Sequence, residues 1–183
     1  VEPLAFAERL THALGKFGRA CWVDASHVQS KSTVMHNPQG TPSPYEMSVA
    51  LDDLEADHDF VLMVADTEPS EWTRLCLSHS DEVLLLADAT QPSDIHAVER
   101  AYMLDRVPRN ESAEILVLMH AASEHSPIGM RRWIDRRPVT DHINLRPTLD
   151  SDIARLARLI SRNAVGLVLG GGGARGFAHL GVW

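Results

Sequence analysis

The chain has 183 residues, of which 44% are hydrophobic and 23% charged, an ordinary composition for a globular protein with a buried core. Its formal net charge of −8 argues against a nucleic-acid partner, because phosphate binding requires a basic surface. The two cysteines are too few for a disulfide framework, and no apolar stretch approaches the roughly 18 residues that span a bilayer. We therefore expect a cytoplasmic protein.

Metal and cofactor sites are not expected. The ten histidines include no His-x-x-x-His pair on a predicted helix. The two closest, His120 and His125, lie in a predicted loop. The cysteines, Cys21 and Cys76, also lack metal-ligand spacing.

Predicted helices and strands alternate along the chain. An amphipathic helix comes first, with apolar residues at Phe6, Leu10, Ala13, Leu14 and Phe17. Apolar runs predict strands at 20–24, 60–65, 83–87, 115–119 and 143–145, and a polar loop occupies 25–44. Five further helices are predicted. Two of them cover 45–56 and 128–137. The other three begin at Ser70, at Ser93 with Asp94, and at Asp150, with Ser70 and Asp150 as capping residues. This order predicts a Rossmann-like α/β domain over 1–162, a doubly wound, mainly parallel sheet with helices on both faces.

Three aspartates follow predicted strands, where α/β sheets place their ligand sites. Asp24, Asp66 and Asp88 would share one edge of the sheet and could hold Mg²⁺ with a nucleotide. They could equally cap the loops that follow, and we favour capping. In the loop 25–44, Ser30 and Lys31 begin a sequence, SKST, that resembles the end of a phosphate-binding P-loop. The glycines that should precede the lysine are missing, so we favour a solvated loop.

The last nineteen residues predict an anion site. The run VGLVL at 165–169 reads as a buried strand, four glycines at 170–173 as a tight turn, and the residues from Ala174 as a helix start. Glycine allows close backbone approach, and the first turn of a helix points free N–H groups at one spot. Residues 171–176 match the dinucleotide motif G-x-G-x-x-G. The same N–H groups could instead form an oxyanion hole for acyl transfer.

The glycine turn closely resembles the first strand and turn of patatin-like phospholipases, through GGG-x-RG after a V-x-L-V-L strand and before G-x-AH-x-GV. The resemblance implies an oxyanion hole formed by Gly171, Gly172, Gly173, Arg175 and Gly176. Gly172 and Gly173 would supply the N–H groups, while Arg175 would fix the loop or meet a phospholipid head group. Patatin-like enzymes are similar in using a serine in G-x-S-x-G and a distant aspartate. No G-x-S-x-G occurs here, since GTPSP at 40–44 fails at its last position.

We therefore expect an excised part of a longer protein, with no catalytic residue of its own and with the serine and aspartate beyond Trp183. Residues 164–183 would then begin a patatin-like domain. An apolar strand at 165–169 without its own sheet should pair with an edge of the 1–162 sheet, exchange with a second copy to give a homodimer, or stay disordered, and we favour pairing.

Three further segments are similar to neuropathy-target-esterase-like proteins. These are SEWTRLC at 70–76, RWIDRR at 132–137 and HINLR at 142–146. In that family, cyclic-nucleotide-binding modules precede such a segment and a patatin-like domain follows it. The resemblance implies a lysophospholipid or phospholipid substrate, contact with a membrane surface, and a linking role for 1–162. A nucleotide- or dinucleotide-binding module is the alternative.

Overall fold

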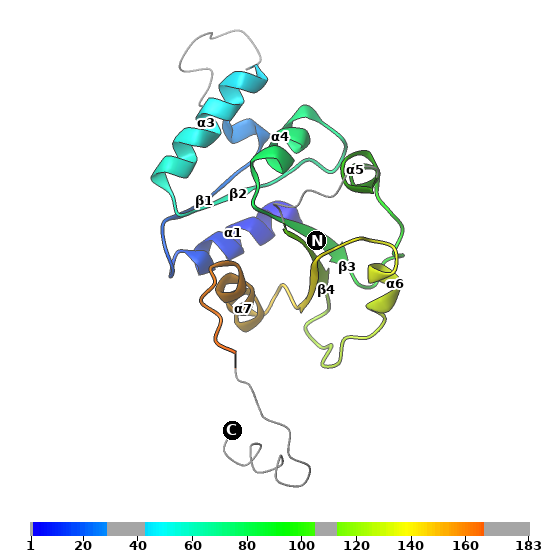
Figure 1. Ribbon diagram of the computed structural model, residues 1–183. Helices are drawn as coiled ribbons and strands as arrows, with labels where there is room; N and C mark the ends of the chain where they lie inside the picture. The colour runs from blue at the N-terminus through cyan, green and yellow to red at the C-terminus, as the bar shows by residue number, and fades with distance from the viewer. Residues whose placement is uncertain (1, 29–42, 105–112, 167–183) are drawn as a thin grey trace.

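The computed structural model describes residues 2–28, 43–104 and 113–166 (Figure 1). Its strands are β1 (Ala20–Val23), β2 (Phe60–Met63), β3 (Glu82–Asp88), β4 (Ala113–Met119) and β5 (Asp141–Leu145). Its helices are α1 (Pro3–Leu14), α3 (Pro44–Asp57), α4 (Glu71–His79), α5 (Ala97–Glu99), α6 (Arg131–Ile134) and α7 (Asp150–Ile160), and α5 continues into a π-helix at Arg100–Leu104. None of the described helices is long and apolar enough to cross a membrane.

The strands form two parallel sheets, which confirms the α/β fold. β1 pairs with β2, and β4 lies between β3 and β5. The prediction of one doubly wound sheet needs a correction, since within the described residues β2 is not hydrogen-bonded to β3.

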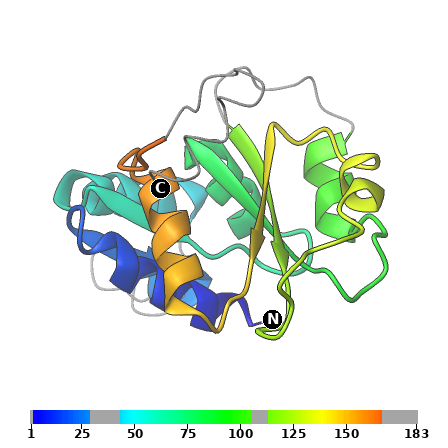
Figure 2. The same cartoon turned by 90° about the horizontal axis from the view of Figure 1, so that it is seen from below.

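Helices cover both faces of the strands, as predicted. α1 and α7 pack side by side on one face (Figure 2). Their apolar residues meet side chains from both sheets, among them Leu62, Leu84 and Val117. Successive side chains of a strand point to opposite faces. Val61 and Met63 accordingly meet α3 and α4, while Leu116 and Leu118 meet Trp133 of α6. The two sheets therefore share one face beneath α1 and α7.

Two predicted helix starts are wrong. The helix expected from Ser93 and Asp94 begins at Ala97, because Glu99 turns back to accept a hydrogen bond from the His96 N–H at 3.1 Å. Asp150 does not cap α7: Leu149 occupies the capping position, and the Asp150 carboxylate accepts from Arg9 of α1 at 2.5 Å.

Two predicted boundaries also change. Residues 25–28 are helical, although a loop was expected there. The helix predicted over 128–137 is only the short α6. The Ser70 cap, in contrast, is confirmed, since the Ser70 side chain accepts from the Thr73 N–H.

Candidate functional site: the strand-end aspartates and the inter-sheet cavity

The three predicted aspartates follow the carboxyl ends of their strands. Asp24 directly follows β1, Asp66 lies just beyond β2, and Asp88 is the last residue of β3. Parallel strands end at one edge of their sheet, which places these carboxylates where α/β proteins bind ligands. The hydrogen bonds of each carboxylate show whether it is open to a ligand or caps the turn that follows it.

Asp24 is bound by the turn that follows it. Its Oδ1 accepts from the His27 backbone N–H at 2.9 Å, from the Ser26 hydroxyl at 2.7 Å, and contacts His27 Nδ1 at 2.8 Å. Burial opposes ionisation of the carboxyl, but the hydrogen bonds from His27 and Ser26 outweigh it and lower the pKa of Asp24 to about 2. Asp24 therefore starts the helical turn at 25–28.

Asp66 and Asp88 are bound in the same way. Asp66 accepts from the Ser70 hydroxyl at 2.5 Å, and its own N–H donates to Thr73 Oγ1 at 3.2 Å. Asp88 accepts from the Thr90 N–H at 2.9 Å and from the Thr90 hydroxyl at 2.7 Å. These bonds lower the pKa of Asp88. All three carboxylates thus make the local bonds expected of capping residues.

The described acidic and histidine side chains do gather elsewhere. Asp52, Glu55 and His79 bring ligand atoms within 4.8 Å of one another on α3 and α4. Both carboxylates are exposed, and the His79 ring is bonded to the Ser48 hydroxyl at 2.9 Å. Because the carboxylates are exposed and the His79 ring is already bonded, we do not assign a metal site to this cluster.

The glycine turn lies outside the described residues, as do Lys31 and its neighbours. The oxyanion residues Gly171, Gly172, Gly173, Arg175 and Gly176 therefore stay a prediction, and so does the division into 1–162 and 164–183. His120 is described and bonds to Asn144 of β5 at 2.9 Å, whereas His125 is exposed.

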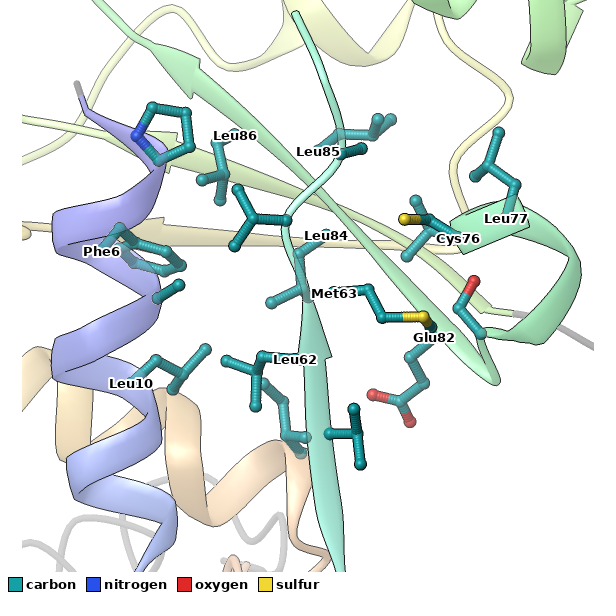
Figure 3. A pocket seen from close by; sticks show the side chains of 18 of the residues that line it. Phe6, Leu10, Leu62, Met63, Cys76, Leu77, Glu82, Leu84, Leu85 and Leu86 are labelled. Carbon is teal, nitrogen blue, oxygen red and sulfur yellow. The ribbon is translucent and has the colours of Figure 1, made fainter. Parts of the chain in front are cut away.

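A cavity of about 770 Å³ lies between β2 and β3, and we call it the inter-sheet cavity. Figure 3 shows Phe6 and Leu10 of α1 approaching it from one side and Cys76 of α4 from the other. Burial raises the pKa of the Cys76 thiol to about 12, so this cysteine stays protonated and is a poor nucleophile. The apolar strands gave no indication of this cavity, because a missing strand pairing leaves no local pattern.

A buried ion pair was also missed. Arg137 and Glu99 are only 5% and 7% exposed and meet at 2.6 Å near the carboxyl end of α5. In the sequence Arg137 belongs to a basic run, RRWIDRR, at the end of the helix predicted over 128–137. Only the contact with a residue 38 positions away shows that it is buried.

Comparison with known proteins extends these observations. The protein-family model "Neuropathy Target Esterase family P-loop like domain" matches residues 1–151. The chain is similar to Lysophospholipase NTE1 of Yarrowia lipolytica, with 28% identity over all of this chain and 16% of that protein. It is also similar to Neuropathy target esterase sws of Drosophila melanogaster, with 29% identity over 97% of this chain and 14% of that protein.

No solved structure is significantly similar to the chain. The chain spans about one sixth of the length of the curated relatives that it matches. The family model covers most of it, including the segments at 70–76, 132–137 and 142–146. The chain belongs to the Neuropathy Target Esterase family and matches its P-loop like domain.

Proposed function

We propose that the protein of which this chain is part is a serine esterase that hydrolyses lysophospholipids or phospholipids. The observation that carries the proposal is the order of two features along the chain. The family match ends at residue 151, and the glycine turn GGGGARG follows at 170–176. The name of the Yarrowia relative, a lysophospholipase, supports the lipid substrate.

The glycine turn would stabilise the negative charge that forms during acyl transfer. When a serine hydroxyl attacks the carbonyl carbon of the ester, the carbonyl oxygen gains negative charge. The backbone N–H groups of Gly172 and Gly173 would donate hydrogen bonds to that oxygen. One such donor contributes on the order of 3 kcal/mol to the transition state. The serine and its aspartate would lie beyond Trp183 in the whole protein.

The α/β domain over 1–162 would be non-catalytic. Its strand-end aspartates are engaged by their own turns, and its Cys76 thiol is protonated, which supports a linking role. The domain would join cyclic-nucleotide-binding modules to the hydrolase, in the cytoplasm and at the periphery of a membrane.

A nucleotide-binding domain is the second candidate, because the matching family model is described as P-loop like. Calorimetric titration with Mg²⁺-ATP separates the two. The local bonds of Asp66 and Asp88 and the missing glycines before Lys31 predict no tight binding. Micromolar affinity that is lost on Asp66→Ala or Asp88→Ala would favour the nucleotide site.

Hydrolysis of lysophosphatidylcholine by the whole protein tests the esterase proposal. We expect turnover that a serine-directed phosphonate abolishes. Gly172→Ala, which adds a Cβ in the turn, should lower kcat by about 10²-fold or more. Asp53→Ala, at an exposed position of α3 and far along the chain from the turn, is the control and should leave kcat unchanged. Phosphonate-insensitive turnover, or equal kcat values in both variants, would refute the proposal.

A further inference from the structure

The second half of α7 presents a row of exposed arginines. Arg155 and Arg158 lie three residues apart, so they share one face of the helix, and both are exposed. Leu159, next to Arg158, is 42% exposed. Arg162 follows in the turn after the helix and is exposed too. We call these four residues the α7 arginine surface.

The positive charge of this surface is not neutralised by neighbouring acids. Among the described side chains, no carboxylate pairs with any of its three arginines. The acidic residues of α7 lie in its first turn and are engaged elsewhere, Asp150 by Arg9 and Asp152 by Arg146. Arg155 donates to a backbone carbonyl, which is a neutral acceptor. The surface therefore keeps its cations available to an anion from outside.

Arg162 has a backbone conformation that favours glycine. Its φ is 58°, and it is the first residue past the end of α7, where helices commonly place a glycine. The Arg162 N–H donates to the Leu159 carbonyl at 3.1 Å, and the Asn163 N–H donates to the Arg158 carbonyl at 2.9 Å. A long side chain destabilises such a left-handed residue relative to glycine. Arginine thus occupies this position at a cost in stability.

Most of the acidic residues lie on the other face of the molecule. Residues 43–82, which include α3 and α4, contain eleven acidic residues and one arginine. α3 and α4 cover one face of the β1–β2 sheet, whereas α1 and α7 lie on the opposite face (Figure 1). Charges farther apart than about 10 Å are largely screened at about 0.1 M salt. The net charge of −8 therefore does not keep anions away from α7.

We propose that the α7 arginine surface binds the phosphate groups of an anionic phospholipid membrane. Guanidinium groups donate paired hydrogen bonds to phosphate oxygens. From Arg155 to Arg162 the cations extend over about 10 Å along the helix axis, which matches a broad array of phosphates better than one small anion. Leu159 would enter the boundary between the head groups and the acyl chains.

The position of this surface in the chain connects it with the proposed function, on which the proposal rests. The glycine turn begins at Gly170, eight residues after Arg162. Eight residues span at most about 28 Å, so a membrane-bound α7 keeps the turn close to the lipid. The oxyanion donors would then be held near the ester bonds of their substrate.

Cosedimentation of the 183-residue chain with vesicles tests the proposal. We expect binding to vesicles of equal parts phosphatidylcholine and phosphatidylserine and weaker binding to phosphatidylcholine alone. About 1 M NaCl should release the chain, because the Debye length falls to about 3 Å. Arg158→Gln should weaken binding about fivefold. Arg74→Gln is the matched control: it removes the same charge from an exposed position of α4 and should leave binding unchanged.

Arg162→Gly separates lipid binding from a structural role. Glycine suits the positive φ at this position, so the melting temperature should stay the same or rise. Vesicle binding should nevertheless weaken about fivefold. Arginines that only stabilise the end of α7, through the helix dipole, would give a lower melting temperature with unchanged vesicle binding.

Three results would overturn the proposal. One is a chain that does not bind the anionic vesicles. Another is an equal loss of binding in Arg74→Gln and Arg158→Gln, which would show an effect of total charge. The last is a chain that ignores vesicles but forms a salt-sensitive complex with the rest of the whole protein, which would assign the arginines to a protein interface. None of these measurements requires ester hydrolysis, so they can fail while the esterase proposal stands.

Discussion

At the residue scale, the contact between Arg137 and Glu99 holds the segment after β3 against α6. The guanidinium makes two hydrogen bonds to the carboxylate, at 2.6 and 2.9 Å. It also donates to the backbone carbonyls of Ser93 at 3.1 Å and Asp94 at 2.9 Å, and lies 5.0 Å from the Trp133 ring centre. The planar guanidinium suits this set of partners, which lysine could not satisfy.

Glu99→Ala should lower the free energy of unfolding by about 3–5 kcal/mol, because it leaves the Arg137 charge buried without its partner. Urea denaturation measures the change. Asp94→Ala is the control: its carboxylate pairs with Arg136 at 3.0 Å, but both side chains are more than half exposed. We expect a change within about 0.5 kcal/mol there. Equal effects of the two substitutions would show that the Arg137–Glu99 pair is not buried.

Asp152 makes stability depend on pH. Its carboxylate accepts from the Arg146 backbone N–H at 3.0 Å, from Nε at 2.8 Å and from Nη2 at 3.0 Å. The side-chain bond from Arg146 is the main cause that lowers the pKa of Asp152 to about 2 from its usual 3.8. The folded state therefore favours the carboxylate. The stabilisation is present above pH 3.8 and is lost as the pH falls toward about 2.

Asp152→Asn should lower the free energy of unfolding by at most about 2 kcal/mol near pH 6. The difference in this free energy between the variant and the unsubstituted chain should shrink as the pH falls from about 5 to about 2. Urea titrations across this range measure it. Asp53→Asn, at an exposed position of α3, is the control and should leave the pH dependence unchanged. A pH-independent difference for Asp152→Asn would contradict the assigned pKa.

At the element scale, α4 illustrates a helix whose start is encoded locally. Ser70 Oγ accepts from the Thr73 N–H at 3.0 Å and donates to Asp66, so one hydroxyl joins the end of β2 to the start of α4. Trp72, Leu75 and Cys76 then pack against the β1–β2 sheet. The spacing of these apolar residues, and the serine before them, made the element predictable.

Ser70→Ala should lower the free energy of unfolding by about 1 kcal/mol, the usual effect of removing a side-chain cap. Ser70→Thr keeps a hydroxyl and should retain most of the stability. Thermal unfolding of the two variants shows whether the hydroxyl is the cause of the stabilisation. If alanine and threonine destabilise equally, the hydroxyl is not the cause.

Other elements could not be predicted, because distant contacts determine them. The carbonyls of Ser93 and Asp94 accept hydrogen bonds from Arg137, more than 40 residues away, and α5 begins only after this segment, at Ala97. The strand-end aspartates were found from their positions after apolar runs. The preference of Asp for such turns favours the capping bonds that the structure has. The split between β2 and β3 depends on strand pairing, which the local sequence does not encode.

At the scale of the whole molecule, α1 and α7 hold two half-sheets together. Leu10, Leu14 and Leu156 are fully buried at this junction and contact side chains from both sheets. The chain belongs to the Neuropathy Target Esterase family, and its proposed role in catalysis is confined to the glycine turn near its end. We therefore propose that the α/β domain is non-catalytic and that another part of the protein supplies the nucleophile.

Mass spectrometry after treatment with a fluorophosphonate tests this separation most directly. The reagent forms a stable bond with an activated serine and adds a fixed mass. We expect one adduct on the whole protein, on a serine in a G-x-S-x-G sequence after Trp183, and none on the chain 1–183. An adduct on any residue of 1–183, or an unlabelled but active whole protein, would contradict it.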